Sequence, residues 1–191
     1  MKPHNFSESL AKSHAAEDLP VWEEIYRQAF PTFAAMVSHR DDGWHQRAGV
    51  DRSVILQNSK RILIDEKARF RNKKTGIVYE DVALEYWSAE AEQSPGWVCK
   101  SLLADYIAYA IVPLGRGYLL PVIQMQEAWA KNGEEWKSEY KIIRAPNEMN
   151  GYEWTTVSVG VPVDKLFKAI GACLRVEFVP LEEADANGAT P

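Results

Sequence analysis

Two runs of β-branched and apolar residues, separated by a short turn, constrain the fold of this chain more than any other feature. The first run spans 49–57 and the second spans 61–70, with the turn-forming pair Asn58-Ser59 between them. Runs of this length and composition are typical of strands, and asparagine with serine is typical of tight turns. The sequence therefore predicts an antiparallel β-hairpin over 49–70.

The pairing within this hairpin brings two carboxylates together. A three-residue loop at 57–59 pairs Leu56 with Lys60, and counting back along both strands then pairs Asp51 with Asp65. Directly opposed Cβ atoms in a sheet lie about 5 Å apart. Two carboxylates that close repel each other in a half-buried sheet, unless a hard divalent cation lies between them. The pairing therefore predicts a metal site.

A lysine completes this arrangement. Side chains alternate along a strand, so Lys67 shares the face of Asp65 and Glu66 points to the opposite face. The ammonium group would orient or deprotonate a metal-bound water. Mg²⁺ fits this donor set because it takes one or two carboxylates and keeps several waters, and Mn²⁺ is the alternative. The same acid-x-Lys spacing also recurs by chance, as in Glu135-Trp136-Lys137. Only the copy that begins at Asp65 follows a strand-like run, Ile62-Leu63-Ile64.

The remaining elements follow from periodicity and breakers. Apolar residues at three- and four-residue steps predict a helix from Pro20 to Val37, with a kink or break at Pro31. A third strand is predicted at 78–88, which would extend the hairpin into a three-stranded meander. The later predictions are a short helix at 97–104, strands at 106–112 and 118–123, a turn at 115–117, a helix at 124–131 that Asn132-Gly133 stops, strands at 140–144 and 155–161, a helix at 163–170 and a strand at 174–179.

Length and composition indicate one folded domain. The 191 residues are 46% hydrophobic and 26% charged, which excludes a disordered or fibrous chain. We expect an N-terminal arm at 1–19, a single domain at 20–180 and a mobile acidic tail at 181–191. Two distant cysteines exclude a disulfide scaffold and a thiolate zinc site. No targeting or membrane segment is visible, so we expect a cytoplasmic protein.

On these residues the chain resembles the PD-(D/E)XK nuclease superfamily. The resemblance covers about 20–112: Asp51 matches the first acidic position, preceded here by Val50 instead of proline, and Asp65-Glu66-Lys67 matches the D-x-K motif. It implies a restriction-endonuclease-like α/β fold, in which a mixed sheet with an αβββαβ core has helices on its faces, here followed by a C-terminal extension. It also implies a metal-dependent deoxyribonuclease that hydrolyses DNA phosphodiesters in restriction, repair, recombination or phage DNA processing.

The resemblance also assigns roles to the residues. Asp51 and Asp65 would hold Mg²⁺ or Mn²⁺ together with the backbone carbonyl of Glu66, and Lys67 would activate or position the water. Many such nucleases add an acid from the first helix. Glu23 is the candidate here, because it lies nearer the apolar stripe of that helix than Glu24 does.

DNA would be the partner. The net charge of −5 excludes binding through overall charge, so contact must come from a local basic patch. Basic residues gather around the second strand, and the residues that we expect to contact DNA are Arg52, Arg69, Arg71 and Lys73. Several members of the family pair two active sites to cut both DNA strands, so the expectation by analogy is a homodimer. The alternative function is a catalytically silent member of this fold that binds DNA or another protein.

The histidines do not predict a metal site by themselves. None of them shows an H-x-x-x-H or similar ligand spacing, and His39 and His45 lie in a polar stretch with Asp41 and Asp42. We therefore interpret this stretch as a surface loop, with the alternative that it approaches Asp51.

Overall fold

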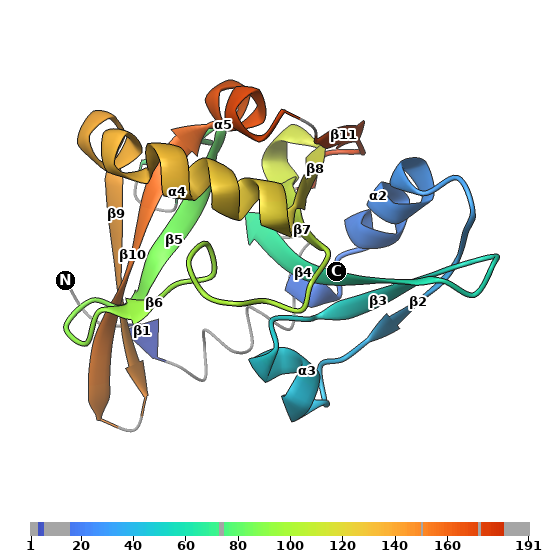
Figure 1. Cartoon of the computed structure of the whole chain (residues 1–191), viewed down its shortest axis with the longest axis horizontal. Helices are drawn as coiled ribbons and strands as arrows, with labels where there is room; N and C mark the ends of the chain where they lie inside the picture. The colour runs from blue at the N-terminus through green and yellow to red at the C-terminus, as the bar shows by residue number, and fades with distance from the viewer. Residues whose placement is uncertain (1–3, 6–15, 73–74, 150, 172, 182–191) are drawn as a thin grey trace. The chain divides into compact units, whose positions relative to one another are not determined.

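The computed structural model describes residues 4–5, 16–72, 75–149, 151–171 and 173–181. Most of the expected arm at 1–19, nearly all of the tail at 181–191, and Lys73 lie outside the described residues. The chain divides into two compact units, and the stretch expected to form one domain contributes to both. The structure has the mixed α/β composition that the sequence predicted, with strands in two sheets and few helices (Figure 1).

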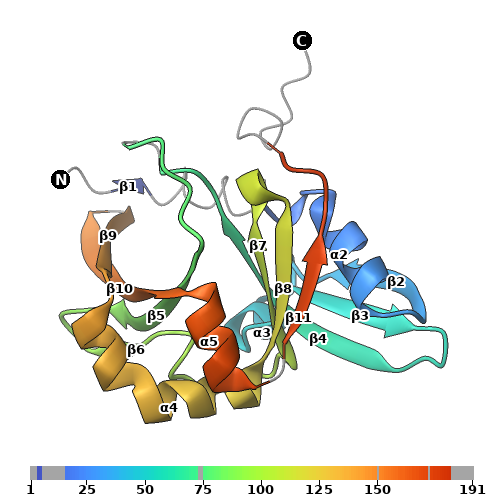
Figure 2. The same ribbon diagram turned by 90° about the horizontal axis from the view of Figure 1, so that it is seen from above.

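The first unit, which we call the β10 unit, comprises Asp81–Ser101 and Ile123–Gly171 with the short β1. Its sheet has the order β1-β9-β10-β5-β6. The helix α5 follows directly on the end of β10, as Figure 2 shows, and contacts both β10 and β5. The bounds are His4–Asn5 for β1, Asp81–Ala89 for β5, Ser94–Pro95 for β6, Val122–Glu139 for α4, Ile142–Met149 for β9, Tyr152–Pro162 for β10 and Val163–Ile170 for α5.

The second unit, which we call the β4 unit, comprises the described parts of His14–Glu80, Leu102–Val122 and Ala172–Pro191. Its sheet has the order β11-β8-β7-β4-β3-β2, in which β4 and β7 are parallel and all other neighbours antiparallel. The bounds are Val21–Ala29 for α2, Phe33–Ser38 for β2, Gly43–Arg47 for α3, Arg52–Leu56 for β3, Arg61–Arg69 for β4, Tyr106–Ile111 for β7, Val112–Leu114 for the 3₁₀ turn η1, Arg116–Pro121 for β8 and Leu174–Glu177 for β11.

The helix α2 covers one face of the β4-unit sheet. Its stripe of Trp22, Ile25 and Tyr26 is fully buried and packs in one core with Ile64 of β4 and Ala108 of β7. This stripe is the one that the sequence predicted. The side chains that share the face of Ile64 therefore point toward α2, and their neighbours along β4 point to the opposite face.

The predicted first helix is wrong in its second half. The helix ends at Ala29, Phe30 is extended, and Phe33–Ser38 forms the edge strand β2. The residue before a proline is disfavoured in helical conformation, so Pro31 ends the helix and does not merely kink it. The same apolar residues then pair with β3.

The predicted hairpin is confirmed with its register. Arg52 pairs with Ile64 and Val54 with Ile62, and the amide of Leu56 donates to the carbonyl of Lys60 at 2.9 Å. These pairs belong to the predicted register, which β3 and β4 keep as far as Arg52; before it, the amide of Asp51 donates to the carbonyl of Ile64. The loop length and the alternation of side chains were therefore sufficient to place the two strands.

The third strand of the predicted meander lies in the other sheet. Strand β5 pairs with β10 and β6, and the second neighbour of β4 is the parallel strand β7. Residues 97–104 contain no helix, and Arg116 and Gly117, predicted as a turn, already belong to β8. Local patterns identify strands but do not specify which distant strand each one pairs with.

The other later predictions, namely the strands and helices after residue 105, are confirmed in type and vary in extent. Helix α5 has the predicted bounds, and Gly171 ends it with φ of 79°. Helix α4, in contrast, continues through Asn132-Gly133 to Glu139. The ring of Trp129 lies against Gly133, where a Cβ would approach it to 3.0 Å. Packing of this kind outweighs the roughly 1 kcal/mol that glycine costs inside a helix. Among the described helices, none has both the length and the apolar character needed to cross a bilayer.

Gly117 allows α2 to pack closely on β8. A Cβ there would lie 2.8 Å from side-chain carbons of Ile25 and 2.9 Å from Val176. We expect Gly117→Ala to lower the free energy of unfolding by about 1–3 kcal/mol, because the core is overpacked. Gly43→Ala is the control, since its Cβ would meet only the flexible end of Arg47 at 3.3 Å. Urea denaturation measures both variants, and equal stabilities would contradict this packing.

Candidate functional site

Asp51 lies at the point where the β3–β4 ladder ends. Its amide donates to the carbonyl of Ile64 at 2.9 Å, and its Oδ2 accepts the amide hydrogen of Glu66 at 2.8 Å. The carboxylate thus takes the place of the next backbone acceptor in the ladder. This bond holds Asp51 beside the segment of β4 that carries the D-x-K motif.

Asp65 and Lys67 point to the sheet face opposite α2. Their side chains form an ion pair; the Asp65 side chain is 5% exposed and that of Lys67 is 34% exposed. Burial raises the pKa of Asp65 to about 7; Lys67 opposes this rise and Asp51 adds to it, partly through a side-chain hydrogen bond. The structure therefore brings Asp51, Asp65 and Lys67 together. Asp51 and Asp65 lie side by side as two carboxylates, and the Lys67 ammonium group forms an ion pair with Asp65.

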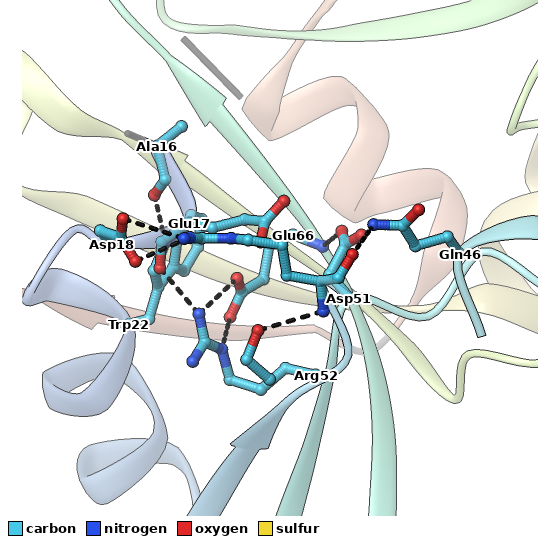
Figure 3. Close-up of polar contacts among 10 residues, drawn as sticks. Ala16, Glu17, Asp18, Trp22, Gln46, Asp51, Arg52 and Glu66 are labelled. Carbon is cyan, nitrogen blue, oxygen red and sulfur yellow. Dashed lines mark hydrogen bonds and ion pairs between the residues drawn. The ribbon is translucent and has the colours of Figure 1, made fainter. Parts of the chain in front are cut away.

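Glu66 points to the α2 face and is fully paired there. Its Oε1 accepts from Nε of Arg52 at 2.6 Å and from the hydroxyl of Tyr26 at 2.5 Å, and its Oε2 accepts from Arg52 at 3.1 Å. Arg52 also donates to the backbone carbonyl of Glu17 at 2.7 Å (Figure 3). Because this carboxylate is occupied, Glu66 would contribute to a metal through its backbone carbonyl, as the resemblance implies.

Burial is the largest influence on the pKa values of Glu66 and Tyr26. It raises the pKa of Glu66 to about 6, although the hydrogen bond and charge of Arg52 oppose the rise. Burial and the neighbouring Glu66 carboxylate raise the pKa of Tyr26 well above its ordinary value. Tyr26 therefore stays protonated and donates its hydrogen bond throughout the physiological pH range.

The structure does not bring Glu23 to the carboxylate pair. Glu23 lies on α2, where it is exposed and bonded to Arg27 at 3.0 and 2.5 Å. Because α2 covers the face that Glu66 shares, Glu23 is on the wrong side of the sheet to reach Asp65. The neighbouring acid, Glu24, bonds to Gln28 on the same helix at 3.4 Å.

The expected DNA-binding residues separate into two groups. Arg52 is buried and bound to Glu66, which corrects its assignment to DNA contact. Arg69 lies at the end of β4, with its guanidinium 5.8 Å from the ring of Tyr79, and Arg71 donates to the carbonyl of Gly76 at 2.9 Å. These two remain candidates.

A cluster that the sequence interpretation missed lies in the loop between β2 and β3. The metal-ligating atoms of His39, Asp42 and His45 all lie within 4.8 Å of one another. The two imidazole rings stack with centroids 3.8 Å apart, and Nδ1 of His45 is 2.7 Å from Oδ2 of Asp42. Burial, followed by the facing His45 ring, lowers the pKa of His39. The three-residue spacing of these positions was the signal available in the sequence.

This cluster adjoins Asp51 across the sheet. The amide of His39 donates to the carbonyl of Asp51 at 2.9 Å, which continues the pairing of Val37 with Ser53. Nε2 of His39 is 2.7 Å from the hydroxyl oxygen of Ser53. Since the amide of Asp51 bonds to Ile64 and its carboxylate to the amide of Glu66, Asp51 lies between His39 on one side and the D-x-K segment of β4 on the other.

A second missed carboxylate is Asp105, directly before β7. Its Oδ2 accepts from the amide of Leu63 at 2.8 Å, and its own amide donates to the Leu63 carbonyl at 2.7 Å. These bonds pair the start of β7 with β4, so Asp105 has a structural role.

No family model matches the chain, and the searches found no similar curated protein and no similar solved structure. Function must therefore be argued from the site itself.

The raised pKa of Asp65 makes stability depend on pH. An aspartate in an unfolded chain has a pKa of about 4. Between that pH and about 7, Asp65 of the folded chain therefore holds a proton that the unfolded chain has released. We therefore expect the free energy of unfolding to fall as pH rises through this window in metal-free buffer. Urea denaturation over a pH series checks this, and Asp65→Asn should flatten the profile. Profiles of the same shape for both proteins would contradict it.

Removing Arg52 should leave a buried carboxylate without its cation. We expect Arg52→Met to lower the free energy of unfolding by about 3–5 kcal/mol, because the buried Glu66 loses its counter-charge and keeps only the Tyr26 hydroxyl as a partner. The double variant Arg52→Met/Glu66→Gln should recover much of that loss, since no charge is then buried. Thermodynamic cycles from urea denaturation measure the coupling, and additive losses would show that the two side chains do not depend on each other.

Proposed function

We propose that this chain is a metal-dependent nuclease that hydrolyses DNA phosphodiester bonds with Mg²⁺ or Mn²⁺. The observation that carries the proposal is the meeting of Asp51 with Asp65 at the end of the β3–β4 ladder, with Lys67 paired to Asp65. The donor set fits a hard cation: two neighbouring carboxylates repel each other, and one of them, Asp65, is buried.

Each residue then has a distinct task. Asp51 and Asp65 hold the ion with the backbone carbonyl of Glu66, and Asp51 is itself positioned by the amide of Glu66. Lys67, bonded to Asp65, orients the attacking water or offsets charge that develops on the phosphate. The bound cation would polarise the phosphate oxygen and lower the pKa of its water. Arg69 and Arg71 would hold the DNA backbone next to this site.

A restriction-endonuclease-like core is part of the proposal, and part of the structure supports it. Helix α2, the β3–β4 hairpin and the parallel strand β7 have the order and directions that such a core needs around its acidic pair. The third strand, β5, pairs in the other sheet, and residues 90–105, all of them described, contain no helix. The resemblance is thus carried by α2, β3, β4 and β7.

A second candidate function is a non-catalytic member of this fold that binds DNA or protein. The burial of Asp65 and its ion pair with Lys67 favour it, because the pair is already closed without a cation. Calorimetric titration with Mn²⁺ separates the two functions. A nuclease site binds the ion and loses this heat in Asp65→Asn, whereas a closed structural pair binds no ion at millimolar concentration.

Cleavage assays test the proposal directly. With Mg²⁺ or Mn²⁺, we expect the full chain to cut at least one substrate among plasmid, single-stranded, flapped and four-way DNA, and EDTA to stop the reaction. Asp65→Asn and Lys67→Met should each lower the rate by about 100-fold or more, since each removes a group that stabilises the transition state.

The chain itself supplies matched controls for this assay. Glu135 and Lys137 have the same acid-x-Lys spacing but lie on helix α4. Glu135→Gln and Lys137→Met should therefore retain the parent rate. Cleavage that Asp65→Asn leaves unchanged, or no cleavage of any substrate, would end the nuclease proposal.

A further inference from the structure

The loop between β2 and β3 carries three metal-ligating side chains on a short stretch of chain. His39 follows β2, Asp42 is the N-cap residue of α3, and His45 lies in the first turn of that helix. On a helix, residues three apart lie above one another, so the His45 ring is brought over the Asp42 carboxylate. The contact of 2.7 Å between Nδ1 of His45 and Oδ2 of Asp42 follows from this placement.

We propose that His39, Asp42 and His45 bind a divalent transition-metal ion of the zinc class. Their ligand atoms already lie within 4.8 Å of one another. Zinc binds imidazole nitrogen and carboxylate oxygen at about 2.0–2.2 Å, so ligands around one ion lie roughly 3.4 Å apart. Small rotations of the three side chains cover the difference. Two imidazoles with one carboxylate select Zn²⁺, Co²⁺ or Ni²⁺ over Mg²⁺, which prefers oxygen ligands.

The backbone around the cluster is held from both sides. The Asp42 carboxylate accepts the amide hydrogens of Trp44 and His45 at 2.9 and 3.2 Å, which fixes the start of α3. The carbonyl of His45 accepts from the amide of Val50 at 2.9 Å, and the amide of His39 donates to Asp51. The ligands therefore stand on a short helix and a strand extension that are both tied to β3.

One imidazole also has a partner that orients it. Nε2 of His39 meets the hydroxyl of Ser53, which is 3% exposed. Metal-bound histidines usually bond through their second nitrogen to such a partner, which fixes the ring and the tautomer. With Nε2 engaged, Nδ1 of His39 is the nitrogen that would face the ion.

The cluster opens to a pocket. Asp18, Ser38 and residues 39–42 line it, so two of the three ligands reach the pocket wall. Three protein ligands with a free position on the solvent side are typical of zinc sites that bind water or a further ligand. Arg40 lies in the same wall and is held there by Glu17 at 2.9 Å and Asp18 at 2.7 Å.

This metal site is independent of the proposed function. It uses none of the carboxylates assigned to Mg²⁺, and its ligands have a different metal preference. The test therefore uses the full chain carrying Asp51→Asn and Asp65→Asn, in which that acidic pair is removed. Asparagine can still accept the amide hydrogen of Glu66, so the end of the ladder is retained.

Co²⁺ is the probe, because its visible absorption reports the ligands directly, and Zn²⁺ competes for the same position. In the Asp51→Asn/Asp65→Asn background we expect one equivalent of Co²⁺, displaced by Zn²⁺ and not by Mg²⁺. Adding His45→Gln or Asp42→Asn should weaken binding by about tenfold or more. Asp42→Asn is informative because asparagine caps helices as well as aspartate does, so α3 stays capped while the anionic ligand is lost.

Asp41→Asn is the matched control. Asp41 lines the same pocket and has the same charge, but it is not part of the cluster. It should bind Co²⁺ as tightly as the background protein does, and circular dichroism should show every variant folded. Absence of Co²⁺ binding in the Asp51→Asn/Asp65→Asn protein, or equal binding by the Asp41, Asp42 and His45 variants, would overturn the proposal.

Discussion

The buried contact of Glu66 with Arg52 and Tyr26 is the interaction on which the arrangement of the β4 unit depends. It joins β4, β3 and α2 in one hydrogen-bonded group, and Arg52 extends it to the carbonyl of Glu17. A buried carboxylate is tolerated only when it is paired in this way. Since side chains alternate along a strand, a slip of one residue would turn Glu66 away from Arg52 and move Asp65 to the α2 face. The contact thus fixes which face receives which charge.

Two neighbouring acids therefore have opposite surroundings. Glu66 accepts bonds from a guanidinium and a hydroxyl, which leaves its charge balanced. Asp65 is hydrogen-bonded to Asp51 and forms an ion pair with Lys67. Burial raises the pKa of both acids, and the charge of Asp51 adds to the rise in each. They differ in that Asp65 also forms a side-chain hydrogen bond with Asp51 that raises its pKa, whereas Arg52 and Tyr26 oppose the rise in Glu66. The face opposite α2 is therefore where a cation or a proton is needed, and this need is the physical basis for proposing chemistry there.

Local sequence patterns predicted the hairpin, its register and the meeting of Asp51 with Asp65, because loop length and side-chain alternation determine all three. They could not predict that β5 joins another sheet, since partner choice depends on contacts distant in sequence. Arg52 was assigned to DNA by its charge alone, because its burial arises only when α2 packs on the sheet. The cluster of His39, Asp42 and His45 was missed because α3 has five residues and no buried side chain, which leaves no hydrophobic pattern to detect.

The backbone of Asp51 links the two candidate metal sites. Its carbonyl accepts from His39 on one side, and its amide donates to Ile64 on the other. A cation that orders the His39 ring therefore also restrains the strand end from which the Asp51 carboxylate projects. The donor sets still keep the ions apart, because imidazole nitrogen and carboxylate oxygen differ in metal preference. The two proposed sites would therefore favour chemically distinct cations although the backbone of one residue connects them.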